Sequence, residues 1–414
     1  MLKRLVSKPR ASLTLPIGVG LALAVLAFPV VCAQSGSNDT AIPTAPLGKT
    51  IRENRKTVAP GITHIHRQTD DPINIHILLV DLSHPHVEVR TVLSHGTVAG
   101  VETVRDMVKR TGAIAGVNGD YWGPHGVEQG LTIVDGEIVI APKHRTALGI
   151  TRDRKAEIGI WSDSWAWNSL VRSPSGNEHP ITMMNSDFGE NWLVFYTDKY
   201  GLATPGDKFP NVTEMVLNGE GEVSEIRFDQ PGIDIPKGYK VLSGRGSSSD
   251  WLRANLKIAD KPVIDLKSSR SWENLQHAIS AGPRILRGGE FFQDPISIFP
   301  EGEEFDLSWK RSHYQLRQPR TAAGVSKDGK KLILITVDGR MPQFSLGIYQ
   351  REMAGLLKEY GAWDGLDLDS GGSTTMVIRG ELVNRPSDRA KPDGSGGVER
   401  PVANGLLIYH RSYK

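Results

Sequence analysis

Cysteine is almost missing from this chain of 414 residues, because the only one is Cys32, close to the N-terminus. Basic residues at positions 3, 4, 8 and 10 precede an apolar run over residues 13–31, and Ala33 follows as a small residue suited to cleavage. The pattern predicts a signal peptide over residues 1–33 and export to the periplasm or the outside of a bacterial cell. An uncleaved membrane anchor and a lipid on Cys32 are the alternatives. Cleavage after Ala33 would leave an exported chain with no disulfide and no thiolate metal site.

An excess of charge of either sign is missing as well. The sequence has 49 Lys and Arg against 47 Asp and Glu, a formal net charge of +2, which argues against a nucleic-acid-binding surface. It contains no Gly-Lys-Ser/Thr phosphate loop, no dinucleotide fingerprint and no Gly-x-Ser-x-Gly elbow. The histidines around His64 and His66 match no closed zinc spacing, so we expect no metal site there. These patterns require no cofactor; they leave open whether Ca²⁺ binds near the acidic residues and whether the chain forms oligomers.

Glycine and short apolar runs are what the chain does have. The 44 glycines favour many turns and short strands over a helical bundle. Apolar patterning predicts strands over residues 73–82, 87–92, 131–140, 332–337 and 375–383, and helices over residues 101–110 and 345–360. We therefore expect an α+β fold, rich in strands of mixed sheets with a few helices, in one domain over residues 61–410. Residues 34–60 lack apolar periodicity and are expected to form a flexible linker.

A weak internal repeat adds to this expectation. Residues 104–120 have the pattern of a helix, a short apolar strand and a polar strand end, and residues 349–369 have the same pattern. After each copy a Gly-Glu turn opens a return strand, and Arg145 then takes the position that Arg400 takes in the second copy. If the similarity exceeds chance, two polar strand ends and two arginines meet at one site.

The segment over residues 365–377 carries the densest set of chemical groups. Asp367 and Asp369 stand two residues apart, so on a strand both carboxylates would project from one face. Gly371 and Gly372 permit positive φ, and consecutive N–H groups in such a turn can bind an anion. The same spacing also fits a glycine-rich hairpin with solvated acids.

Other candidate residues for a phosphate or sugar ligand lie elsewhere in the chain. Guanidinium groups bind phosphate through paired N–H donors, and amides, hydroxyls and carboxylates bind sugar hydroxyls. These candidates are Arg145, Arg320, Arg340, Arg400, Ser373, Thr374, Asn118, Asp120 and Asp338. Trp161, Trp165 and Trp167 alternate along one strand face, which fits a carbohydrate platform or, better, a buried sheet face.

Taken together, several separated motifs resemble the phosphodiester glycosidase family over most of residues 61–410. They are Val117-Asn118-Gly119, Ala281-Gly282-Pro283, Arg320-Thr321-Ala322, Val337-Asp338-Gly339-Arg340, Asp369-Ser370-Gly371-Gly372-Ser373-Thr374-Thr375 and Glu399-Arg400-Pro401-Val402. Compared with the family pattern Asn-Leu-Asp-Gly-Gly-Gly-Ser, Asp367 replaces the Asn and Ser370 replaces the first Gly. Asp120 likewise replaces the last Gly of an Asn-Gly-Gly motif. These departures bear on the substrate more than on the reaction class.

The resemblance implies a hydrolase that cleaves a sugar-1-phosphodiester, of the N-acetylglucosamine-1-phosphate type, at the anomeric carbon. Asp369 would act as nucleophile or general base, and the turn N–H groups with Arg320 or Arg400 would stabilise the departing phosphate. Three further residues would orient sugar hydroxyls or water: Asp367, Asn118 and Asp338. Export makes cell-envelope or extracellular glycopolymers the expected substrates. A glycoside hydrolase with two carboxylates and a non-catalytic polysaccharide-binding module are the alternatives.

Overall fold

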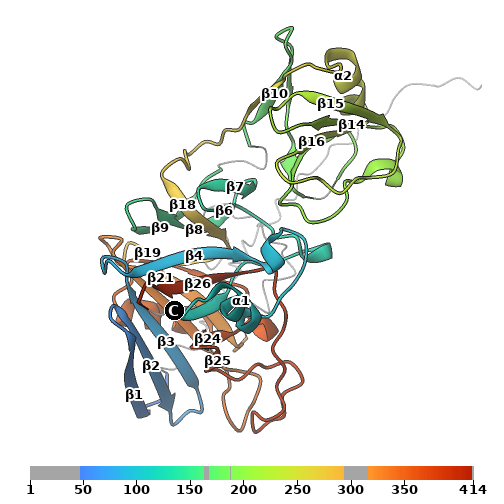
Figure 1. Ribbon diagram of the computed structural model, residues 1–414. Helices are drawn as coiled ribbons and strands as arrows, with labels where there is room; N and C mark the ends of the chain where they lie inside the picture. The colour runs from blue at the N-terminus through green and yellow to red at the C-terminus, as the bar shows by residue number, and fades with distance from the viewer. Residues whose placement is uncertain (1–46, 163–166, 187, 293–315, 413–414) are drawn as a thin grey trace, which may run out of the picture. The chain divides into compact units, whose positions relative to one another are not determined.

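The largest sheet has eight antiparallel strands drawn from both ends of the chain (Figure 1). The computed structural model describes residues 47–162, 167–186, 188–292 and 316–412, so the predicted signal peptide and Cys32 lie outside the described residues. In spatial order the strands are β1 (Thr50–Ala59), β2 (Ile62–Thr69), β3 (Asn74–Asp81), β22 (Lys331–Val337), β21 (Arg320–Val325), β23 (Asp364–Asp367), β19 (Arg284–Arg287) and β20 (Glu290–Phe291). N-terminal strand β3 therefore pairs directly with C-terminal strand β22, from Asp81–Lys331 to Ile75–Val337.

A second sheet has five strands and carries one of the predicted helices. Its order is β25 (Glu381–Leu382), β24 (Met376–Ile378), β5 (Ala115–Asn118), β26 (Asn404–His410) and β4 (Val87–Leu93). Helix α1 (Val104–Thr111) begins after Thr103, whose side chain accepts the Asp106 N–H, and ends at Gly112 with φ of +72°. The helix buries Val104, Met107 and Val108 against this sheet, as its apolar spacing requires.

A third sheet shares a hydrophobic core with the first two. Its order is β7 (Glu137–Ile140), β6 (Thr132–Val134), β18 (Leu275–Ser280), β8 (Thr146–Thr151) and β9 (Ala156–Ile160). The shared core joins fully buried residues from all three sheets, among them Leu78, Leu334, Val117, Leu406 and Leu148. Burying one face of each sheet against the others holds the ends of β5 and β23 together, where the functional site lies.

Residues between β9 and β18 form two further sheets. One has the order β12 (Met183–Met184), β13 (Leu193–Thr197), β16 (Lys240–Arg245), β14 (Val212–Leu217) and β15 (Val223–Phe228); the other has β11 (Glu178–Pro180), β10 (Leu170–Arg172) and β17 (Val263–Asp265). Helix α2 (Ser247–Asn255), which the sequence patterns did not predict, packs on β16 and β14. Trp161 and Trp167 are buried in this core and form no exposed platform, whereas Trp165 lies outside the described residues.

The strand-rich α+β fold is thus confirmed, with helix α4 (Gln350–Glu359) inside the second predicted helical range. The expected linker over residues 34–60 needs a correction at its C-terminal end. Thr50–Ala59 form β1, which pairs with β2 along the edge of the large sheet, and eight of its ten residues are exposed. Because an exposed edge strand buries little, its polar sequence shows no apolar alternation.

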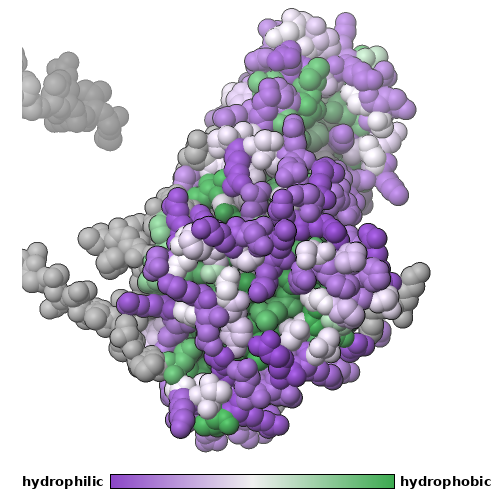
Figure 2. Space-filling model, turned by 90° about the vertical axis from the view of Figure 1, so that its left-hand side faces the viewer, coloured by the Kyte–Doolittle hydropathy of each residue, from purple (hydrophilic) through white to green (hydrophobic). Residues whose placement is uncertain are grey.

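Hydrophilic side chains surround smaller apolar patches on the face drawn in Figure 2. Among the described residues, no helix has the length and apolar character needed to cross a membrane.

Candidate active site

The ends of β5 and β23, from two different sheets, meet at Asp369. The Asp369 N–H donates to the carbonyl of Gly119 at 2.9 Å, and the Asn118 side-chain amide donates to the carbonyl of Asp369 at 2.6 Å. The Asn118 side-chain oxygen accepts from the Thr321 hydroxyl and from the Thr375 N–H. The two halves of the weak repeat therefore meet, as expected. Asn118, predicted to orient sugar hydroxyls or water, is fully buried and uses its amide to hold the Asp369 backbone in place.

The Asp369 carboxylate is 9% exposed and has few partners for a buried acid. One oxygen accepts the Ser370 N–H at 2.8 Å, and the Ser373 hydroxyl also bonds the carboxylate. Burial raises the pKa of Asp369 to about 7, against the opposing effects of Ser373, Ser370 and the charge of Arg400. The carboxylate therefore changes its protonation state near neutral pH, which suits a group that exchanges a proton during a reaction.

A glycine turn follows Asp369 and is flanked by two guanidinium groups. Gly371 has φ of +71°, and a Cβ built on it would lie 2.9 Å from Nη2 of Arg340. A Cβ on Gly372 would overlap Nη2 of Arg400 and a carboxylate oxygen of Asp388. Glycine is therefore required at both positions for the arginines to approach the backbone this closely. In the structure, Arg340 and Arg400 both lie next to this turn.

The two guanidinium groups make the turn suitable for an anion. Arg400 binds Asp388 through two hydrogen bonds of 2.7 and 2.9 Å, and it reaches the Ser373 hydroxyl at 3.5 Å. Arg340 donates to the side-chain oxygen of Gln318 at 2.7 Å. Burial, followed by the positive charge of Arg400, lowers the pKa of Arg340. Because the positive charges of Arg340 and Arg400 repel each other, a doubly charged phosphate beside them would be electrostatically stabilised.

Not every predicted anion-binding group is available in this turn. The Gly371 N–H, expected to face the phosphate, donates to the carbonyl of Pro319 at 2.9 Å. Thr374 is held through its backbone, since its N–H reaches the carbonyl of Gly371 and its own carbonyl accepts from Asn384. The Thr374 hydroxyl is buried and has no hydrogen-bond partner among the described residues. A ligand oxygen would satisfy it.

Replacing Gly372 with alanine is expected to lower kcat/KM about 10- to 100-fold. The new methyl group would displace the Arg400 and Asp388 side chains, and a charged hydrogen bond to a ligand is worth about 1.5–3 kcal/mol. Steady-state kinetics on a sugar-1-phosphodiester measures the effect. Gly355→Ala is the matched control, because a Cβ there meets nothing within 4 Å inside α4, so activity should stay unchanged. Equal activity of the two variants would remove Arg400 from the binding site.

A buried ion pair lies near the same strand end. Asp120 and Arg145 are 0% and 4% exposed, and Nη2 of Arg145 lies 3.3 Å from the Asp120 carboxylate. Burial raises the pKa of Asp120, with Arg145 opposing it, and the charge of Asp120 in turn raises the pKa of Asp369. The Arg145 guanidinium also lies over the Tyr121 ring. Of the two predicted residues, Asp120 thus lies close enough to Asp369 to affect its pKa, and Arg145 is bound to Asp120.

One buried acid near this pair was not predicted from the sequence. Glu128 is 2% exposed, and burial raises its pKa well above the usual range. One carboxyl oxygen accepts from the Asn404 amide at 3.3 Å, and the Asn404 side-chain oxygen accepts the Asp120 N–H at 2.8 Å. Asn404 therefore connects the two acids. Glu128 belongs to no recognisable sequence motif, and it reaches this position because it lies in the loop after β5.

Asp367 and Arg320 form a second buried pair. Both are fully buried, with 2.9 Å between Nη1 of Arg320 and the Asp367 carboxylate. Gln350 of α4 donates to the same carboxylate oxygen at 2.7 Å, and Nε of Arg320 donates to the carbonyl of Ile348. Burial raises the pKa of Asp367 to about 6, although Arg320 opposes the shift. The structure thus brings the two predicted residues into contact with each other, and the second Asp367 oxygen is buried with no hydrogen-bond partner among the described residues.

Asp338 is likewise enclosed by protein donors. Its carboxylate accepts from Asn74, from Asn384 and from the Arg385 N–H, and the residue is fully buried. Burial raises its pKa to about 7. Asn384 also accepts the Met376 N–H. Through Asn384, Asp338 therefore helps to position the strand after the glycine turn.

The histidines on β2 and β3 form a stack. The rings of His66 and His76 lie 4.4 Å apart, and His64 bonds His76 at 3.1 Å. Burial lowers the pKa of His64 to about 4, so the ring is neutral. Across the described ranges there is no group of three or more His, Cys, Asp or Glu side chains arranged to hold a metal ion.

Comparisons with known proteins support the resemblance to a family. Residues 211–409 match the phosphodiester glycosidase family. A mouse N-acetylglucosamine-1-phosphodiester alpha-N-acetylglucosaminidase is 39% identical over 125 residues, 30% of this chain and 23% of that protein. The human protein of the same name is 24% identical over 150 residues, 36% of this chain and 26% of that protein. The chain thus spans about a quarter of the length of these two curated relatives.

Two solved structures share the fold. A protein from Synechocystis superimposes with a TM-score of 0.71 at 17% identity, covering 87% of this chain and 64% of that one. A protein from Burkholderia pseudomallei superimposes with a TM-score of 0.67 at 24% identity, covering 82% of this chain and 74% of that one. At these identities the likeness concerns the fold alone.

Proposed function

Because residues 211–409 carry a phosphodiester glycosidase domain, we propose that this chain hydrolyses a sugar-1-phosphodiester at the anomeric carbon. The observation that carries the proposal is the position of Asp369 beside a glycine turn flanked by Arg340 and Arg400. The mouse and human relatives are named for the removal of N-acetylglucosamine from such a phosphodiester. The N-terminal pattern of basic and apolar residues supports export, so glycopolymers of the cell envelope or the medium are the proposed substrates.

The proposed step breaks the bond between C1 and the phosphate oxygen. The bonding electrons leave with the phosphate, which becomes a monoester whose second pKa is about 6 and therefore needs little protonation to depart. Asp369 either attacks C1 itself or takes the proton from the water that does, and the water oxygen ends on the sugar. Arg340 and Arg400 stabilise the second negative charge that develops on the phosphate. One acid and two cations are sufficient for this chemistry.

Activity is expected to fall as the pH drops below about 7. Asp369 must be ionised to act as nucleophile or base, and its pKa is raised to about 7 by burial. Below that value kcat/KM should decrease about tenfold per pH unit, because only the ionised fraction reacts. A pH–rate profile from pH 5 to 9 measures it. Activity that instead rises towards pH 5 would assign Asp369 the role of a general acid, which contradicts the proposed step.

The reaction itself is tested with UDP-N-acetylglucosamine and with a simple alkyl phosphodiester of N-acetylglucosamine-1-phosphate. Released sugar is followed in ¹⁸O-labelled water. We expect the label in the sugar, since attack is at C1. Label in the phosphate would mean a phosphodiesterase, release of nitrophenol from neutral aryl glycosides would mean an ordinary glycosidase, and no product over hours would mean a binding module.

A further inference from the structure

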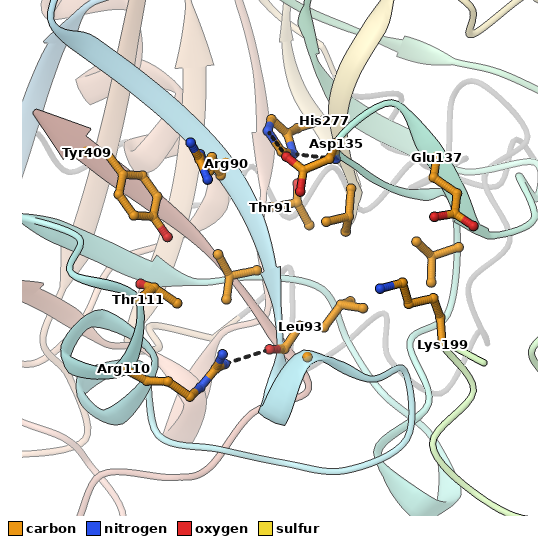
Figure 3. Close-up of a pocket in the computed structure, with 14 residues that line it drawn as sticks. Arg90, Thr91, Leu93, Arg110, Thr111, Asp135, Glu137, Lys199, His277 and Tyr409 are labelled. Carbon is orange, nitrogen blue, oxygen red and sulfur yellow. Dashed lines mark hydrogen bonds and ion pairs between the residues drawn. The ribbon is translucent and has the colours of Figure 1, made fainter. Parts of the chain in front are cut away.

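A pocket of about 290 Å³ lies along β4, and none of its lining residues belongs to the candidate active site. Thr91 and Leu93 of β4 form its floor, the turn between β6 and β7 contributes Asp135 and Glu137, and Lys199 comes from the segment after β13 (Figure 3). A cavity of this volume is at the small end of ligand sites, so it would hold a compact ligand such as one sugar ring.

One polar side chain in this pocket is buried and incompletely bonded. His277 of β18 is 1% exposed, and its Nδ1 accepts the Asp135 N–H at 3.4 Å. The Nε2 therefore carries the proton, because burial lowers the pKa of His277 to about 4 and keeps the ring neutral. This N–H has no hydrogen-bond partner among the described residues, since the nearest Asp135 oxygen is 3.6 Å away. A ligand oxygen in the pocket would supply the missing acceptor.

The two arginines of the pocket are each bound to a neighbouring glutamate. Arg90 and Arg110 also line it, but each is bound through two hydrogen bonds to a glutamate, Glu88 and Glu102 respectively. Among the described residues this leaves the Lys199 ammonium without an ion-pair partner, against the carboxylates of Asp135 and Glu137. With Glu88 and Glu102, which lie outside the lining, the charges in and next to the pocket sum to −1, so no net positive charge is left to favour a phosphate group.

We propose that this pocket is a second carbohydrate site, which binds one unit of a neutral or amino-substituted glycan. Carboxylates accept hydrogen bonds from sugar hydroxyls, and the Lys199 and His277 N–H groups donate to sugar oxygens. Val92, Val134 and Val139 provide an apolar wall for the C–H face of the ring. Such a site would hold a glycopolymer on the enzyme independently of the phosphate-binding turn.

The test is binding, measured without turnover. Wild-type protein is applied to an array of immobilised neutral, amino-substituted and phosphorylated oligosaccharides, and the strongest ligand is then titrated by calorimetry. The Asp135→Asn/Glu137→Gln double variant is expected to bind at least tenfold more weakly. Asparagine tolerates the positive φ of 52° at position 135, so the turn is kept. Asp207→Asn/Glu220→Gln removes two exposed carboxylates outside the pocket and should bind like the wild type.

Three results would overturn the proposal: no glycan held above background, a preference for phosphorylated sugars, or unchanged affinity in the double variant. Equal unfolding temperatures of the wild type and both variants exclude a folding defect. Because no step depends on hydrolysis, a chain without phosphodiester glycosidase activity could still pass this test. The binding test can therefore fail while the hydrolase activity is present, and the activity can be absent while the binding test succeeds.

Discussion

Replacing Asp369 with asparagine is expected to lower kcat on a sugar-1-phosphodiester about 1000-fold or more. Asparagine keeps the shape of the side chain but can neither attack C1 nor take a proton, and removal of a nucleophile or base typically costs several orders of magnitude. KM should change little, because Arg340 and Arg400 still flank the glycine turn. Single-turnover and steady-state measurements at pH 8 separate the two constants.

The stability of the same variant shows whether the loss comes from chemistry. Burial raises the pKa of Asp369 to about 7, above its unfolded value near 4, so the folded state holds a proton that the unfolded state releases between these two pH values. The ionised carboxylate therefore reduces stability, and this cost is fully present above pH 7 and absent below about pH 4. Asp369→Asn should unfold at a higher temperature than the wild type at pH 8 and at an equal temperature at pH 4. Asp328→Asn, at an exposed turn, is the control for activity.

Two outcomes would defeat the assignment of Asp369. Turnover near the wild-type value would mean that another group does the chemistry, with Asp120 and Glu128 as the nearest buried acids along the β5 end. Lost activity combined with lower stability at pH 8 would mean that the carboxylate has a structural role. A catalytic role for the buried carboxylate requires that the variant loses turnover while its unfolding temperature stays the same or rises.

The sequence predicted the elements whose pattern is local. Strand pairs such as β6 and β7, around the turn at Asp135 and Gly136, follow from alternating apolar residues and a turn that needs positive φ. Helix α1 follows from its apolar spacing, which places Val104, Met107 and Val108 on one buried face. Edge strand β1 could not be predicted, because its exposed residues show no alternation and its pairing partner decides its structure.

Site residues that belong to one local motif could be predicted from the sequence. Residues that reach the site only through the packing of different sheets could not. Asp369, the glycine turn and Arg400 come from motifs that keep their local geometry. The prediction that Asp367 and Asp369 share a face assumed that one strand includes both residues, whereas β23 ends at Asp367 and the period of two holds only within a strand. Glu128 has no local signature at all, since only the fold brings it to Asn404 and Asp120.

Replacing Arg320 with methionine is expected to lower the free energy of unfolding by about 3–5 kcal/mol. The variant would leave the Asp367 carboxylate fully buried with only Gln350 as a donor, and breaking one side of a buried ion pair costs about this much. Asp367 would then have to bind a proton to remain inside, so the loss should be larger at pH 8 than at pH 5. Urea unfolding at the two pH values measures both effects.

The double variant Arg320→Met/Asp367→Leu decides between a structural and a catalytic pair. Well-packed apolar side chains of similar size often replace a buried ion pair without loss of stability, so the double variant should recover most of what Arg320→Met loses. Its turnover should also recover if the pair is structural, because each residue is fully buried and bound to the other. A double variant that folds as well as the wild type but stays inactive would return Arg320 and Asp367 to the ligand site. Recovered turnover would leave Asp369, Arg340 and Arg400 as the groups that act on the phosphodiester.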